Sequence, residues 1–171
     1  MKIQHLLAAL LAVTAVSPAA LALEVSPVLI DVKPVSQNHQ SRYEGTTTKS
    51  LNVAVTNSSG EELALTLKYY FFSRSVQGGK LTLMKTGERP FVLKSHGIAT
   101  VATETVSAKH VTAHIEGATQ DTPQQRGNPG TRVPASGEKI VGHAVQILQG
   151  GKVLVENFSE PSLKAQIGAG R

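Results

Sequence analysis

The sequence has 171 residues, 40% of them hydrophobic, no cysteine and a formal net charge of +5. A chain without cysteine excludes structural disulfides, lipid attachment to a cysteine, and thiolate chemistry at a metal or nucleophile site. The positive residues are scattered rather than clustered, which argues against nucleic-acid binding. The mild basic excess is compatible with an acidic partner, such as a glycan or an outer-membrane surface.

Residues 1–22 have the layout of a secretory signal peptide. Lys2 supplies a positive charge, residues 6–16 are apolar and uncharged, and Ala20 and Ala22 frame a cleavage site. The apolar run is shorter than the about 20 residues that span a bilayer. We therefore expect cleavage after Ala22 and no transmembrane segment in the mature chain. An exported domain without disulfides favours the periplasm or outer surface of a bacterium.

The first part of the mature chain predicts strands. Residues 25–32, interrupted by Pro27, predict an edge strand, and the polar residues 34–48 predict a long connection. Apolar residues then occupy the odd positions of 51–55 and 63–71. Alternation of this kind predicts two strands, and the turn at 57–60 predicts that they form a hairpin with the odd positions inward.

The second part predicts shorter strands and a flexible loop. Residues 81–83, 91–93, 98–106 and 111–115 are β-prone, with turns at 77–80, 86–88 and 95–97. Residues 117–137 are rich in glycine, proline and polar side chains and predict a flexible loop. Gly150-Gly151 joins 140–148 to 153–158 as a closing hairpin. The tail, residues 161–171, is expected to fray.

These elements predict an all-β fold, an antiparallel β-sandwich of about seven to eight strands in one domain, residues 23–160. The stretches LNVAVTNSSGEELALTLKYYFF (51–72) and KIVGHAVQILQGGKVLVENFS (139–159) resemble the early and the last strand pairs of small exported immunoglobulin-like β-sandwich proteins. Some of those proteins are associated with pili or cell surfaces. The chain departs from antibody-type domains, which have paired cysteines and a buried tryptophan, and from type IV pilins, which retain an apolar N-terminal helix. The resemblance implies an immunoglobulin-like sandwich.

No motif predicts catalysis, a metal or a cofactor. His110 and His114 are four residues apart, but in a strand that spacing is about 13 Å, too far to share one metal ion. No Gly-x-Ser-x-Gly elbow is present, and the carboxylates are scattered. We therefore expect a protein that is not an enzyme, without catalytic residues, metal ligands or cofactor.

Two features are candidates for binding. The aromatic run 69–72 holds two of the three tyrosines and two of the four phenylalanines. Its alternation turns Tyr70 and Phe72 outward beside Lys68, where either a loop or the tail covers them or they form a binding patch. The second feature is the loop 117–137 with Arg126 and Arg132, which is either a surface insertion or a recognition loop.

The sequence thus predicts a non-catalytic interaction protein of a periplasmic or cell-surface assembly, and the resemblance above implies an association with pili. Its expected partner is another envelope or surface protein. The alternative is a carbohydrate-binding module that takes a glycan.

Overall fold

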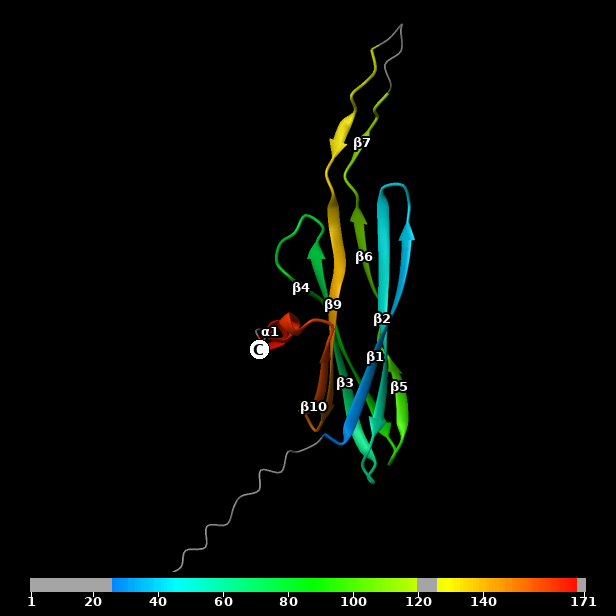
Figure 1. Cartoon of the computed structure of the whole chain (residues 1–171), viewed down its shortest axis with the longest axis vertical. Helices are drawn as coiled ribbons and strands as arrows, with labels where there is room; N and C mark the ends of the chain where they lie inside the picture. The colour runs from blue at the N-terminus through cyan, green and yellow to red at the C-terminus, as the bar shows by residue number, and fades with distance from the viewer. Residues whose placement is uncertain (1–25, 120–125, 169–171) are drawn as a thin grey trace, which may run out of the picture.

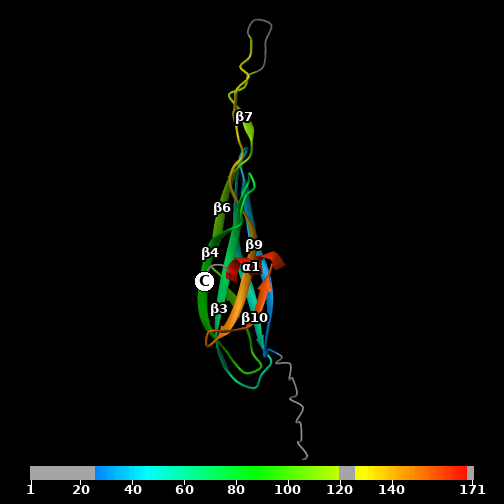
Figure 2. The ribbon, with the colours of Figure 1, turned by 90° about the vertical axis from the view of Figure 1, so that its left-hand side faces the viewer.

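A computed structural model describes residues 26–119 and 126–168. The predicted signal peptide lies outside these residues. The described chain forms an all-β sandwich, which confirms the predicted fold class. Figures 1 and 2 show that it is elongated along the strand direction. The elements in chain order are β1 (Val28–Gln40), β2 (Glu44–Asn57), β3 (Leu63–Ser75), β4 (Thr82–Leu93), β5 (Ile98–Ala102), β6 (Val106–Val111), β7 (His114–Glu116), β8 (Thr131–Val133), β9 (Ser136–Gln149), β10 (Lys152–Phe158), the 3₁₀ turn η1 (Pro161–Leu163) and α1 (Lys164–Gly168).

The strands form two antiparallel layers. In the first layer, β2 pairs with β1 along one edge and with β5 and β6 in succession along the other. In the second, the order is β10-β9-β3-β4. The start of β9 also pairs with the end of β6, at Gly137 and His110, and so joins the two layers. The chain crosses from the first layer to the second between β2 and β3, and the two layers pack as an antiparallel sandwich.

The apolar core lies between the layers. Leu51, Val53 and Val55 of β2 belong to the same buried cluster as Leu65 and Leu67 of β3. The predicted inward positions of both strands are therefore confirmed. Burying a side chain of this size contributes about 1.5–3 kcal/mol relative to leaving it exposed, so these two strands supply much of the driving force for the fold.

The closing hairpin is also as predicted. Gly150 and Gly151 connect β9 to β10 with φ angles of 57° and 86°. Two successive positive φ angles define the turn that matches the twist of a two-residue hairpin, and glycine adopts them without a steric penalty.

Two predictions about strand pairing are wrong. β2 and β3 do not pair with each other, since they lie in opposite layers, and residues 57–62 connect the layers rather than close a hairpin. Residues 34–48 are not a connection. They extend β1 and β2 into a long hairpin whose register continues to Gln40 opposite Gly45. Polar side chains on both faces of this hairpin removed the apolar alternation that marks a strand.

Residues 86–88 are likewise not a turn, because β4 runs through them. Gly87 lies opposite Tyr69, and a Cβ atom at position 87 would overlap the phenol ring. The glycine therefore makes room for a buried tyrosine across the ladder, rather than reversing the chain.

Part of the predicted loop 117–137 is a β-ribbon. β8 pairs with β7, Ile115 opposite Arg132, and the last residues of the segment already belong to β9. Figure 1 shows this ribbon continuing from the ends of β6 and β9, away from the core. Residues 120–125 of the predicted loop lie outside the described chain.

The C-terminal tail packs on the second layer instead of fraying. Leu163 is 1% exposed and clusters with Phe72, Tyr70 and Ala144. Gly142 leaves room for it, since a Cβ atom there would lie 2.7 Å from a Leu163 methyl group. Figure 2 shows α1 against the outer side of β9 and β3. Among the described residues, no helix is long and apolar enough to cross a membrane.

Candidate functional site

The predicted aromatic patch is covered. Tyr70 is 7% exposed and Phe72 is 1% exposed, so the expectation that they face solvent is wrong. The alternative that the tail covers them is what the structure shows, because Leu163 and Ile167 pack over both rings. β3 is buried on both faces here, which a period-two pattern does not reveal when residues on both faces are aromatic.

Lys68 does lie beside Tyr70, as predicted. Its ammonium pairs with Glu88 at 2.7 Å and lies 5.9 Å from the centre of the Tyr70 ring. The hydrogen bond to Glu88 raises the pKa of Lys68 above 10.5. The Tyr70 hydroxyl donates to Gln146 Oε1 at 3.2 Å. These groups are satisfied within the fold.

A small pocket of about 220 Å³ remains between this cluster and α1. Lys68, Tyr70 and Phe72 line it together with Gln166 and Ile167. Three of the predicted binding residues therefore share one pocket. Its opening is set by the tail.

Arg126 and Arg132 are exposed and lie elsewhere. Arg132 belongs to β8 in the ribbon, and Arg126 precedes it in the chain. Figure 1 places the ribbon at one end of the molecule and α1 near its middle, so the two predicted features do not form one site.

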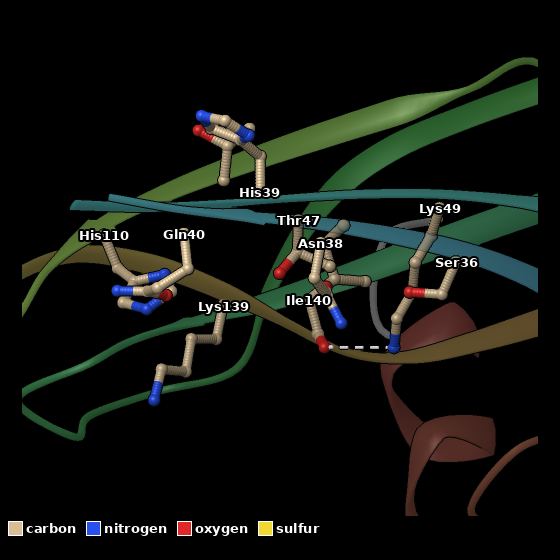
Figure 3. Close-up of a pocket in the computed structure, with 10 residues that line it drawn as sticks. Ser36, Asn38, His39, Gln40, Thr47, Lys49, His110, Lys139 and Ile140 are labelled. Carbon is tan, nitrogen blue, oxygen red and sulfur yellow. Dashed lines mark hydrogen bonds between the residues drawn. The ribbon is translucent and has the colours of Figure 1, made fainter. Parts of the chain in front are cut away.

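A larger cleft opens where the apolar core ends. We call residues 36–49, 109–116 and 131–140 the arm. They continue the two layers beyond the core. Within the arm, the space between the layers is not filled by apolar side chains, and an open cleft of about 490 Å³ remains. We call it the arm cleft. Figure 3 shows its lining residues on β1, β2, β6 and β9.

Strand register explains why polar side chains line the arm cleft. The inward positions of β1, β2 and β6 are apolar in the core and become polar in the arm. In successive rows across the sheet, Ser36 lies opposite Lys49, Asn38 opposite Thr47, and Gln40 opposite Gly45, which lies opposite His110. All of these except Gly45 line the arm cleft.

Gly45 lets the side chains of the row nearest the β1–β2 turn approach one another. A Cβ atom there would lie 2.6 Å from His110 Nε2 and 2.7 Å from Gln40 Oε1. The imidazole and the amide therefore both pack over the β2 backbone. Because Gly45 has no side chain, the hydrogen-bonding groups of His110 and Gln40 both fit into the cleft.

The arm cleft is basic. Lys49 reaches across it and donates a hydrogen bond of 3.4 Å to the carbonyl oxygen of Ile140 (Figure 3). Lys139 lies on the β9 side. No carboxylate belongs to the described residues that line the cleft. Glu44 and Glu138 lie on the same strands, but neither is among its lining residues.

His143 lies deeper, opposite Phe71, on the face of β9 that turns toward the core. It is half-buried. Desolvation, and after it the positive charge of Lys49, lowers its pKa below 6.5. At neutral pH this imidazole is therefore uncharged, and it adds no positive charge next to Lys49.

Stacked side chains occupy the tip of the arm. The rings of Tyr43 and His114 are parallel within 5°, with centres 3.8 Å apart. The Arg42 guanidinium lies 5.0 Å from the Tyr43 ring centre. The amide of Thr112 donates to the carbonyl of Tyr43 at 2.7 Å and ties the β1–β2 turn to the start of β7. Among the described residues, no group of histidine and carboxylate side chains could hold a metal ion.

Sequence reasoning missed both the arm cleft and the tip, because it predicted an unstructured connection for residues 34–48. One signal was present in that segment. Three consecutive threonines, residues 46–48, have strong β-propensity, and they favour a strand over a loop.

No family model and no curated protein matches the chain. Solved structures show a distant likeness. A β-glucuronidase 2 of Bacteroides uniformis, in a calcium-binding mutant, is 15% identical over 74% of this chain with a TM-score of 0.43. A protein of Bacteroides fragilis assigned as a β-galactosidase is 18% identical over 75% of this chain, with a TM-score of 0.41. The matched part spans only 12% and 15% of those two chains. A protein of Akkermansia muciniphila is 13% identical over 82% of this chain and 74% of its own, with a TM-score of 0.32.

Proposed function

We propose that this chain is an exported, non-catalytic binding protein of a periplasmic or cell-surface assembly, and that it contacts its partner with the arm. The observation that supports this proposal is the arm cleft. The inward faces of four strands continue past the apolar core and present hydrogen-bonding side chains to an open space of about 490 Å³. Ligand sites commonly have volumes of about 300–1,000 Å³.

The arm also supports the proposal through its unpaired edge. β1 pairs only with β2, so the backbone groups along its other edge have no strand partner among the described residues. Such an edge is a template for a strand of another protein. The resemblance to exported immunoglobulin-like proteins supports a surface assembly, pili included, as the setting.

The protein-partner proposal is tested by photo-crosslinking in the native envelope. A photoreactive residue at Asn38, inside the arm cleft, is compared with one at Lys33, which is on the same strand but points away from the cleft. We expect crosslinks to one partner from position 38 and not from position 33. Crosslinks from position 33 alone would show that the partner sits on the outer face and that the arm cleft is not the site.

The alternative, a carbohydrate-binding role, is favoured by the chemistry of the lining. The cleft offers hydroxyl, amide and ammonium groups rather than apolar anchors. A sugar can satisfy such groups, since each of its hydroxyls both donates and accepts hydrogen bonds.

A further inference from the structure

We infer that the arm cleft binds an acidic oligosaccharide, a glycan whose sugars carry carboxylate or sulfate groups. This inference rests on the carbohydrate-binding alternative of the proposed function, because it names the class of glycan that the same cleft would bind. It follows from three properties of the described lining residues: their hydrogen-bonding capacity, their charge, and the absence of tyrosine, tryptophan and phenylalanine among them.

The hydrogen-bonding capacity is high and of mixed kind. Ser36 and Thr47 offer hydroxyl groups, and Asn38 and Gln40 offer amides, which have two N–H donors and a carbonyl acceptor each. No side-chain hydrogen bond between these four residues occupies those groups. Gln40 donates only to the carbonyl of Ser41, at 3.2 Å. A ligand with many hydroxyls can therefore pair with several of them at once.

The charge selects among ligands of this kind. The Lys49 ammonium donates one N–H to the Ile140 carbonyl, and its other two N–H groups remain available. This hydrogen bond holds the positive charge in place across the cleft. Neither Lys49 nor Lys139 forms an ion pair with a carboxylate of the described residues. Charge-assisted hydrogen bonds from lysine to a carboxylate or sulfate are about twice as strong as neutral ones.

The absence of tyrosine, tryptophan and phenylalanine from the described lining argues against two other ligands inside the cleft. Neutral glycans gain much of their affinity by stacking a sugar face on a tyrosine or tryptophan, and none lines this cleft in the described chain. A protein partner that gained its affinity inside the cleft would need an apolar or aromatic anchor there, whereas strand pairing along the free edge of β1 needs none. Ile140 is the one large apolar residue among the described lining residues, and it is 8% exposed. Charge and hydrogen bonds must then carry the affinity.

The test is titration calorimetry with the full mature protein and four probes. A short oligogalacturonate and a heparin-derived oligosaccharide carry the acid as carboxylate and as sulfate, respectively. A neutral dextran oligosaccharide and a polyglutamate peptide are the controls. We expect both acidic oligosaccharides or one of them to bind, and added salt to weaken the binding by screening. Binding to oligogalacturonate alone or to the heparin probe alone would identify the acidic group.

Matched variants locate the site. Lys49→Met should weaken binding of the acidic probe at least about tenfold, or about 1.4 kcal/mol, because it removes a charge-assisted hydrogen bond. Lys33→Met removes the same charge from the outer face of β1, where Lys33 pairs with Asp31 at 3.3 Å, and should leave affinity within about twofold. Asn38→Ala should weaken binding without a change of charge. Thermal unfolding of each variant confirms that it is folded.

Other outcomes overturn the inference. If dextran binds as tightly as the acidic probes, the cleft does not select its ligands by charge. Polyglutamate that binds more tightly than either glycan, and depends on Lys49, would keep the arm cleft as the site but make its ligand an acidic peptide. If the acidic probes bind equally well to wild type and to Lys49→Met, the arm cleft is not their binding site. If no probe binds, the glycan inference fails, while crosslinks from position 38 in the envelope would still support the arm as a protein-binding site.

Discussion

His110 lies directly opposite Gly45 in the β2–β6 ladder, and its imidazole covers the space that a side chain at position 45 would occupy. Gln40 approaches the same space from the other side. The geometry of the arm cleft next to the β1–β2 turn therefore depends on Gly45, a residue without a side chain.

Gly45→Ala tests this dependence. The added methyl group would meet His110 Nε2 and Gln40 Oε1 well inside contact distance, so both side chains must move. We expect binding of the acidic oligosaccharide to weaken several-fold, and the free energy of unfolding to fall by about 1–3 kcal/mol, the usual cost of overpacking. Calorimetry and denaturant unfolding measure the two effects. Gly60→Ala, where no atom lies within 4 Å of the added group, is the matched control. Unchanged affinity in Gly45→Ala would show that His110 and Gln40 do not contact the ligand.

Phe72→Ala should destabilise the fold about as much as Leu65→Ala. Both residues are buried, on opposite faces of β3, with exposures of 1% and 3%. Emptying a leucine site costs about 2–5 kcal/mol and a phenylalanine site about 3–5 kcal/mol, because a cavity remains. Denaturant unfolding measures both. Val92→Ala is an exposed control on the neighbouring strand, where we expect a change within about 0.5 kcal/mol. A much smaller loss for Phe72→Ala than for Leu65→Ala would show that the tail does not cover the ring in solution.

The core and the arm differ in how far the sequence predicts them. Leu51, Leu65 and their neighbours alternate with a period of two, so their strands and inward faces follow from the sequence. The alternation of apolar and polar residues does not determine which strands pair with each other. The partner of β2 is decided by long-range packing between layers, and it proved to be β1 rather than β3. The turn at Gly150-Gly151 was predictable because the local chemistry of two glycines is sufficient to form it.

The arm shows the opposite case. Ser36, Asn38 and Gln40 occupy inward positions, but nothing in their composition separates a polar strand from a polar loop. They become strand because Thr47 and its neighbours pair with them across the hairpin, a contact that the sequence pattern does not show. The candidate site was missed for that reason: it is built from the residues that break the pattern used to find strands.

Leu163→Ala should loosen the tail and open the small pocket next to Tyr70. Leu163 is 1% exposed and packs against Phe72 in the second apolar cluster. We expect a loss of about 2–4 kcal/mol, less than a core leucine if the tail can detach by itself. Hydrogen exchange should show faster exchange in residues 161–168 than in β3. Ser162→Ala, on an exposed neighbour, is the control. Exchange protection in 161–168 that is unchanged by Leu163→Ala would show that other contacts, such as the ion pair between Lys164 and Glu156, hold the tail.

Stability should fall as the pH is lowered from about 7.5 to about 5.5, and His143 should account for part of the fall. Desolvation, and after it the charge of Lys49, lowers the pKa of His143 in the folded state, whereas in the unfolded chain the pKa of His143 is about 6.5. Above that pH neither state binds the proton. As the pH falls through about 6.5, the unfolded state takes up a proton that the folded state resists, so the free energy of unfolding decreases until the folded-state pKa is passed.

His143→Leu separates this contribution from the rest. Its loss of stability over the same interval should be smaller than that of wild type, measured by denaturant unfolding at each pH. A hydrogen bond from Lys85 lowers the pKa of Glu104 below 4.5. This carboxylate therefore titrates below the pH interval of the measurement and does not affect the comparison of the two proteins. His39→Gln removes an imidazole from an exposed position of β1 and is the matched control for the loss of a histidine. The same slope in wild type and His143→Leu would contradict a neutral, desolvated ring at the base of the arm. His143 would then add positive charge next to Lys49 within this pH interval.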